Sequence, residues 1–189
     1  MNAVWIDVPE EFLEERRRLG HDKRDELWEG VLHMVPPGSF VHGSISVAIL
    51  VALTPIAKRR GLLALSSEIG VFNPEVDKSY RIPDVSVGRP EHASERGFEG
   101  AELVIEVLSP NDESRKKFDF YARVGVREVW IVDPKTRATE LHALRADGSG
   151  YEPIPFVDGI ATSGVLGITL EIVEGPVLRL RDGSEIADV

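Results

Sequence analysis

Two carboxylates stand within stretches that otherwise predict apolar strands. Glu106 interrupts the run LVIEVL at 103–108, and Asp84 follows Pro83 at the start of DVSV. A carboxylate in a core strand is expensive to desolvate unless a metal ion, a Lys or Arg partner or a proton neutralises it. On neighbouring strands, two such groups can share a divalent cation through oxygen ligands, as Mg²⁺ prefers.

The chain around the second carboxylate predicts a strand, a helix and another strand. Residues 103–108 are rich in β-branched side chains, and Asn111 and Asp112 are N-cap candidates. Apolar residues then recur at helical spacing from 113 to Gly125. With the apolar run at 129–132, this pattern implies a right-handed parallel crossover whose helix has about three turns.

Several motifs in a fixed order resemble a known family. They are DELWEG at 25–30, SFVHGSIS at 39–46, RIPDVSV at 81–87, LVIEVLSP at 103–110, and the stretch from Lys117 to GVREVWIVDP. Together they resemble the Uma-two family of restriction endonuclease-like proteins, within the PD-(D/E)XK nuclease superfamily. The resemblance covers about residues 25–170 and does not depend on any single motif.

The resemblance implies an α/β fold, a restriction endonuclease-like mixed sheet flanked by helices, with additional β-hairpin strands. We expect a single domain over residues 1–189, with a family-like core at about 25–170 and an N-terminal helical extension over 1–22. The 42% hydrophobic content suits one substantial core.

The resemblance assigns catalytic roles to Asp84, Glu106 and Lys117. It implies that Asp84, Glu106 and the backbone carbonyl of Val107 hold Mg²⁺ or Mn²⁺, which polarises a phosphate and lowers the pKa of the attacking water. The superfamily Lys two residues after the acid is replaced by Leu108. Lys117 stands at the family's matching position, where it would orient the water and stabilise charge on the phosphate.

Four residues are candidate accessory groups of this site: Glu26, His42, Glu68 and Tyr121. Each has a structural alternative. Glu26 can pair with a Lys at the rim, and His42 can serve as a hydrogen-bonding group of its helix. Glu68 can face solvent from a strand, and Tyr121, one helical turn after Lys117, can serve in packing.

The central residues have an alternative of their own, in which Glu106 pairs with Lys117 and Asp84 with Arg81 as buried ion pairs. Three functions therefore stay open. The first is a metal-dependent endonuclease acting on nucleic acid, with DNA the first expectation. The second is a degenerate nuclease fold that acts as a binding or assembly module. The third is a hydrolase of another phosphate ester, such as a nucleotide.

Composition limits these choices. The net charge of −10 argues against a general nucleic-acid binder, although a metal site is locally acidic and a bound cation reverses that sign. Basic clusters at 16–18, 58–60 and 115–117 are either solvated helix faces or phosphate contacts. Cysteine is absent, and we expect a soluble cytoplasmic protein, without a membrane-spanning apolar run or membrane contact. The family resemblance also implies a homodimer.

The remaining pattern predicts further elements. They are a charged helix at 9–19, a strand pair within 25–38, a long helix from Ser39 to Gly61, strands at 62–65 and 68–72, a charged loop at 88–101, a hairpin of 139–144 with 151–155, and strand-like pieces at 165–172 before a tail with little core content.

Overall fold

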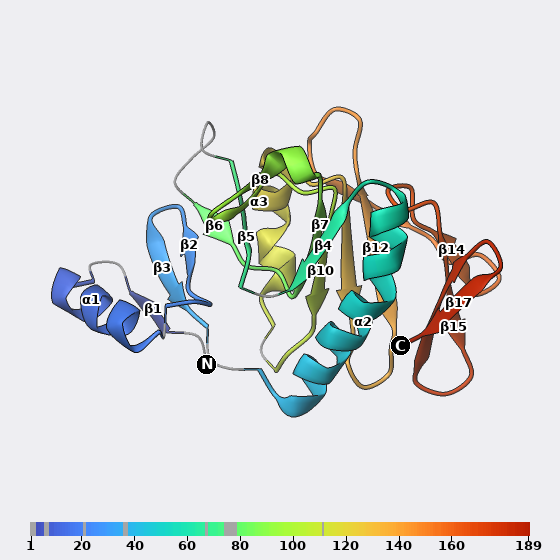
Figure 1. Ribbon diagram of the computed structural model, residues 1–189, viewed down its shortest axis with the longest axis horizontal. Helices are drawn as coiled ribbons and strands as arrows, with labels where there is room; N and C mark the ends of the chain where they lie inside the picture. The colour runs from blue at the N-terminus through green and yellow to red at the C-terminus, as the bar shows by residue number, and fades with distance from the viewer. Residues whose placement is uncertain are drawn as a thin grey trace.

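The structure is a computed structural model that describes residues 3–5, 8–20, 22–35, 38–66, 68–73, 79–110 and 112–189, with the backbone alone at 3–5. Three β-sheets carry most of the chain. Helix α1 (Glu10–Leu19) lies at one end of the molecule and the last sheet at the other (Figure 1).

The central sheet positions the candidate site. Its strand order is β13 (Tyr151–Ile154), β12 (Thr139–Leu144), β11 (Glu128–Val132), β10 (Leu103–Val107), β7 (Val85–Gly88), β4 (Leu63–Ser66). Strands β10 and β11 are parallel, whereas β7 pairs antiparallel with β10. The parallel crossover, the adjacency of the two acid-bearing strands and the mixed α/β sheet are therefore confirmed.

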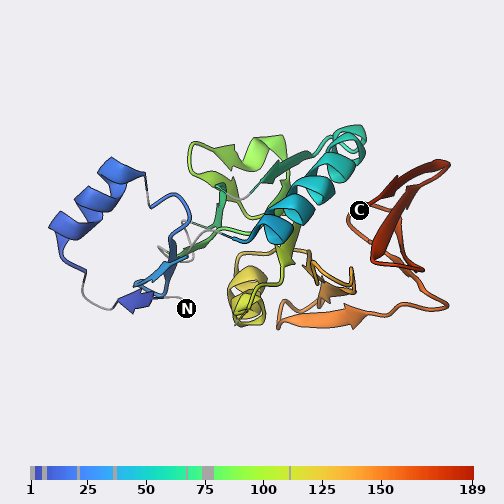
Figure 2. The same ribbon diagram turned by 90° about the horizontal axis from the view of Figure 1, so that it is seen from below.

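Helices cover both faces of this sheet. Helix α2 (Phe40–Arg59) lies on one face, and the 3₁₀ helix η2 (Ser114–Lys117) with α3 (Phe118–Arg123) lies on the other (Figures 1 and 2). Alternation along β10 divides its side chains between two apolar clusters. Those of Leu103, Ile105 and Val107 join α2 in the first cluster, and that of Val104 joins α3 in the second.

The first sheet lies beside the central one and carries the N-terminal motifs. Its order is β1 (Ala3–Trp5), β3 (Val31–Met34), β2 (Glu26–Trp28), β6 (Tyr80–Arg81), β5 (Gly70–Phe72), β9 (Gly97–Glu99), β8 (Ala93–Ser94). The predicted irregular loop at 88–101 is wrong, because this segment forms the 3₁₀ helix η1 (Pro90–His92) and the β8–β9 hairpin. Gly97 permits the hairpin to approach β5, since a Cβ there would meet the Gly70 carbonyl oxygen at 1.9 Å.

The third sheet corrects the predicted tail. It comprises β14 (Ile160–Thr162), β15 (Thr169–Val173), β16 (Val177–Asp182) and β17 (Glu185–Asp188). Leu178 and Leu180 of β16 are buried in the cluster beneath α2, so the tail does contribute to the core. In β16 the apolar residues alternate with charged ones, so the strand pattern is weak in the sequence.

The long helix corrects another expectation. Ser39 caps α2 by accepting a hydrogen bond from the amide of His42, as predicted. We expected no apolar run of membrane-spanning length. By length and composition alone, however, α2 is long and apolar enough to cross a membrane. Its apolar character has a packing role, because Ile45, Ile49 and Leu53 are buried against the sheet.

The segment after Asp112 also differs in detail from the prediction. The Asp112 carboxylate accepts from the amide of Ser114, although the N-cap position of η2 is Glu113, and Asn111 lies outside the described residues. One helix of about three turns was expected, but the chain forms a 3₁₀ turn and then a short α-helix. This break sets the position of Lys117 at their junction.

Asp182 joins the end of α2 to the third sheet. Its carboxylate accepts from Arg59 at 2.6 Å and from Arg60 at 2.8 and 3.0 Å. The hydrogen bonds of Arg60 and Arg59 hold the pKa of Asp182 well below its ordinary value. This carboxylate therefore stabilises the fold above its unfolded-state pKa, and the contribution is lost as the pH falls toward the folded-state pKa.

We expect Asp182→Asn to lower the free energy of unfolding by about 1–2 kcal/mol at pH 7, because the charged hydrogen bonds to two guanidinium groups are lost. Urea unfolding at pH 7 and at pH 3 measures the effect, and the difference from wild type should shrink at the lower pH. Glu185→Gln, at an exposed partner of Arg59, is the matched control. An undiminished difference at pH 3 would contradict the assignment.

Candidate active site

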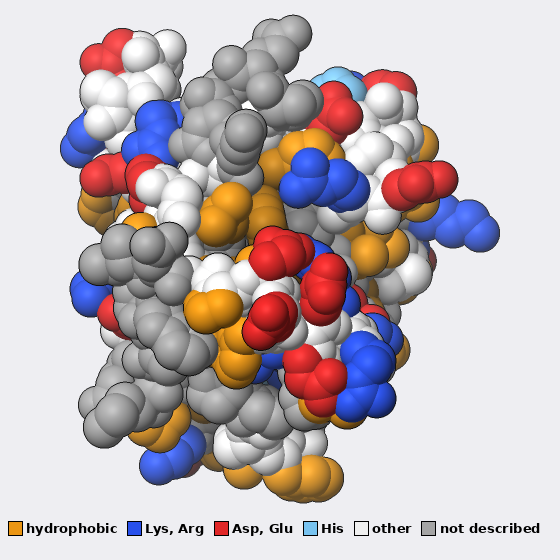
Figure 3. Space-filling view, turned by 90° about the vertical axis from the view of Figure 1, so that its left-hand side faces the viewer, with side chains coloured by type: hydrophobic (Ala, Val, Ile, Leu, Met, Phe, Trp, Pro, Cys, Tyr) orange, Lys and Arg blue, Asp and Glu red, His pale blue; other side chains and the backbone are white. Residues whose placement is uncertain are grey.

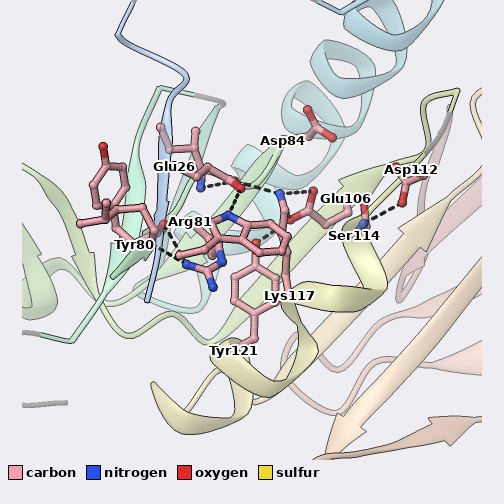
Figure 4. Close-up of polar contacts among 12 residues, drawn as sticks. Glu26, Tyr80, Arg81, Asp84, Glu106, Asp112, Ser114, Lys117 and Tyr121 are labelled. Atoms are coloured by element: carbon pink, nitrogen blue, oxygen red, sulfur yellow. Dashed lines mark hydrogen bonds and ion pairs between the residues drawn. The ribbon is translucent and has the colours of Figure 1, made fainter. Parts of the chain in front are cut away.

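The register of β7 and β10 places the two predicted acids together. Ile105 pairs with Val85, and the same register continued by one residue sets Glu106 opposite Asp84. Directly opposed residues of an antiparallel pair lie about 4.5–5.5 Å apart at Cα. The Asp84 carboxylate also accepts a hydrogen bond of 2.7 Å from the amide of Val107. Both acids thus lie at the carboxyl end of β10 (Figure 4).

Lys117 meets Glu106 from the other side of the strand end. Its Nζ lies 2.9 and 3.1 Å from the two carboxylate oxygens of Glu106, and 2.9 Å from Glu26 Oε1. The Tyr121 hydroxyl donates to Glu106 Oε1 at 2.5 Å. Lys117 and Tyr121 reach the same carboxylate because residues four apart share a helix face.

Glu26 holds this group against the first sheet. Its Oε1 accepts from the amide of Ile82 at 2.8 Å, and its Oε2 accepts from the Trp28 indole at 2.8 Å. Both carboxylate oxygens are therefore engaged by the protein. Glu26 fixes the Lys117 ammonium in place, which agrees with a Glu that pairs with a Lys.

His42 meets the opposite side of Asp84. The two side chains approach to 3.2 Å between Nε2 and Oδ2, and each is 15% exposed. Their hydrogen bond raises the pKa of His42 against the effect of burial, and a backbone hydrogen bond to Val107 acts in the same direction. The imidazole therefore faces Asp84, one of the three groups expected to ligate a cation.

Burial controls the charges at the centre of the site. It raises the pKa of Glu106 to about 7 against the pull of the Lys117 ammonium, and the charges of Asp84 and Glu26 act in the same direction as burial. Burial also disfavours the charged form of Lys117. The carboxylates of Glu106 and Glu26 outweigh that effect and raise the pKa of Lys117, so the ammonium stays charged.

The donor set fits a hard divalent cation. Asp84 and Glu106 supply carboxyl oxygens, the donors that suit Mg²⁺ or Mn²⁺, whereas both oxygens of Glu26 are already engaged. Within the described ranges, no three His, Asp or Glu side chains are already gathered at the spacing of a metal centre.

Other predicted partners lie elsewhere. Arg81 does not neutralise Asp84, since its guanidinium is bound to the carbonyls of Leu27 and Tyr80 and faces Glu29. The Glu106–Lys117 ion pair, in contrast, is present.

Glu68 is also remote from the lysine. It is exposed and lines a separate hollow with Tyr80 and Arg96. Glu113 pairs with Lys116 rather than with Lys117. The basic clusters at 16–18, 58–60 and 115–117 likewise include residues held by carboxylates, such as those of Asp25, Asp182 and Glu140.

Sequence reasoning missed another buried acid, Glu128 at the start of β11. Its carboxylate accepts from the Trp130 indole at 2.6 Å and from the amides of Gly164 and Val165 at 3.0 and 3.2 Å. The signal that revealed Glu106 was available, because Glu128 also borders an apolar strand. Its partners are backbone amides far along the chain, just before β15. Glu128 therefore has a structural role in joining the third sheet to the central sheet.

We expect Lys117→Met to lower the free energy of unfolding by about 3–5 kcal/mol, because it leaves Glu26 and Glu106 buried without their cation. Adding Glu106→Gln should recover part of this loss. Chemical denaturation measures both variants. Lys116→Met, at the exposed neighbouring lysine, is the control and should change stability by less than about 0.5 kcal/mol. Equal losses of stability from the two lysine substitutions would contradict the buried ion pairs of Lys117 with Glu26 and Glu106.

Comparisons with known proteins identify a family and a similar fold. A family model described as Uma2, putative restriction endonuclease, matches residues 9–173. The matched part includes α1, which the sequence motifs had placed outside the family-like core, and it ends in β15.

A solved structure has a similar fold. It is the crystal structure of a putative nuclease belonging to DUF820 from Anabaena variabilis ATCC 29413, with a TM-score of 0.62 and 18% sequence identity. The similarity covers 82% of this chain and 90% of that chain. At this identity it supports the restriction endonuclease-like fold alone. A search of curated proteins finds no match.

Proposed function

Because the chain belongs to the Uma2 family of putative restriction endonucleases, we propose that it is a metal-dependent endonuclease that hydrolyses phosphodiester bonds in nucleic acid, with DNA as the first substrate to test. The observation that carries this proposal is the meeting of Asp84, Glu106 and Lys117 at one end of β7 and β10. A family-level nuclease assignment and this geometry agree, while the metal requirement is our inference.

The residues that would hold a Mg²⁺ or Mn²⁺ ion are Asp84, Glu106 and the carbonyl of Val107. The chemistry that such an ion supplies is polarisation of the scissile phosphate and a lower pKa for water. Asp84 is the member of this set that solvent reaches, since its side chain is 15% exposed and that of Glu106 is 5% exposed. Substrate therefore approaches from the side of Asp84 and His42.

Lys117 is the group that would act on the developing negative charge. Its ammonium stays protonated and is held by two carboxylates, so it is preorganised to stabilise a phosphate oxygen or orient the attacking water. Glu26 and Tyr121 act as positioning residues in this scheme. Glu26 fixes the ammonium and Tyr121 orients the Glu106 carboxylate.

We expect Asp84→Asn and Lys117→Ala each to lower cleavage of plasmid or single-stranded DNA by at least about 10²-fold, because each removes a charge from the reacting centre. The assay uses Mg²⁺ or Mn²⁺, with EDTA as the blank and Lys116→Ala as the matched control. In a parallel titration, Mn²⁺ should bind wild type and fail to bind Asp84→Ala. Turnover by Lys117→Ala at the wild-type rate would remove the role given to Lys117.

A binding or assembly module without hydrolysis is the second candidate. The replacement of the superfamily Lys by Leu108 favours it, as does the engagement of Lys117 by two carboxylates. The surface gives a further reason, since acidic and basic side chains intermingle on the face in Figure 3 instead of forming a basic field. Nucleic-acid binding with no turnover in either metal would establish this function, and turnover of free nucleotides alone would instead indicate a small phosphate-ester hydrolase.

We also propose the homodimer that the family resemblance implies. The outer face of α2 supports it, because Phe40, Val47 and Val51 are 88%, 57% and 66% exposed, and exposed apolar patches often mark protein contacts. Val51→Lys should convert the dimer to a monomer in size-exclusion chromatography with light scattering. Ile172→Lys, at an exposed apolar residue of β15, is the control and should stay dimeric. A monomeric wild type would contradict the proposal.

A further inference from the structure

The hollow that Glu68 lines lies on the face of the first sheet that points away from Lys117. Its volume is about 230 Å³, and Phe72, Tyr80 and Ile82 are among its lining residues. Phe72 and Tyr80 are register partners on β5 and β6, so their rings share one face of the sheet. Aromatic and aliphatic side chains therefore form part of the wall, and charged side chains form much of the rest.

The neighbouring residue on β6 defines the two faces. Arg81 packs between the rings of Trp28 and Phe120, at 4.4 and 4.3 Å from the ring centres, on the side of the catalytic group. Adjacent strand residues point to opposite sides, and Tyr80 and Arg81 leave β6 in opposite directions (Figure 4). The hollow thus lies on the face of the first sheet opposite the one from which Glu26 contacts Lys117.

Two cations at this hollow have no carboxylate within ion-pair distance in the described part of the chain. They are Lys23 and Arg96, and both line the hollow. The Arg96 guanidinium lies 5.2 Å from the Phe72 ring centre and 6.0 Å from that of Tyr80. Many other arginines of this acidic protein are held by carboxylates, such as Arg59, so the pair is available to an anionic ligand.

Carboxylates complete the rim of the hollow. Asp25 is held by Arg16 in a bidentate pair of 2.8 and 2.6 Å, whereas Asp22 and Glu68 also line the hollow. A carboxylate accepts hydrogen bonds from an exocyclic amino group such as the N4 of cytosine. The hollow therefore combines aromatic surface, cations and base-edge acceptors.

The chain path links the hollow to the catalytic residues. Ile82 lines the hollow, and its amide donates to the Glu26 carboxylate that holds Lys117. Ile82 precedes Asp84 by two residues, which span at most about 7 Å between their Cα atoms. The chain segment that connects the hollow to Asp84 is therefore short.

We propose that this hollow binds one unstacked base of a single-stranded nucleic acid, with Arg96 and Tyr80 against the base and Lys23 at a flanking phosphate. The substrate class rests on the proposed function. Small-molecule pockets usually measure about 300–1,000 Å³, so this smaller hollow suits a single ring system. Base stacking on aromatic and Arg side chains requires bases that are free of a duplex.

The test is fluorescence anisotropy with a labelled single-stranded oligo(dC) in EDTA, which separates binding from any metal-dependent cleavage. Arg96→Ala should weaken binding about tenfold, because stacking contributes about 1–3 kcal/mol per base. Tyr80→Leu should do the same, with circular dichroism to confirm its fold. Arg145→Ala, at an exposed arginine of the distant β12–β13 turn, is the matched control and should bind as wild type does.

A second comparison addresses the base itself. Replacing the cytosines by abasic residues should weaken binding to wild type and abolish the difference between wild type and Arg96→Ala. Undiminished binding of the abasic strand, or equal oligo(dC) affinities of wild type and Arg96→Ala, would overturn the proposal. Arg96-dependent binding by a protein that cleaves no substrate would support the hollow and contradict the nuclease function, so the two failures are distinguishable.

Discussion

The rest of the site depends on the desolvation of one carboxylate, that of Glu106. It lies in a strand covered on both faces, at 4% exposure, where an isolated negative charge is strongly disfavoured. Lys117 and Tyr121 compensate for this burial, and Glu26 holds the lysine in turn. The same interactions that make the carboxylate tolerable in the core also prearrange an ammonium beside it.

The fold brings these groups together through strand order. Antiparallel pairing sets Asp84 beside the end of β10, and the parallel crossover returns the chain through η2 and α3, which carry Lys117 and Tyr121. On the opposite face, the first turn of α2 delivers His42 to Asp84. Three separate parts of the chain therefore meet at the same end of the central strands β7 and β10.

Charge pairing limits how this acidic protein can meet nucleic acid. Many of its arginines are bound to carboxylates, as Arg59 and Arg60 are to Asp182, so their charge is not freely available to phosphates. Recognition must then use a few local contacts in place of a broad basic field. The hollow beside Tyr80 offers contacts of this kind, on a sheet whose other face carries Glu26, the partner of Lys117.

The sequence by itself determined the strands around Glu106 and part of the pattern of the site. Apolar periodicity located the strand, helix and strand around Glu106, because burial imposes a period of two on strands and 3.6 on helices. Acids inside or at the start of apolar runs identified Glu106 and Asp84, and the family motifs added Lys117. Such local signals survive in one dimension because each depends on near neighbours in the chain.

Only the tertiary structure decided which charges meet. Glu26 lies 91 residues from Lys117, and His42 lies far in sequence from Asp84, so no spacing rule predicts either contact. The same applies to Glu128 with the amides near Gly164, and to Glu68, which sequence order placed near the acids and the fold places in another hollow. Pairing partners are selected by strand order and register, and these emerge only when the whole core is packed.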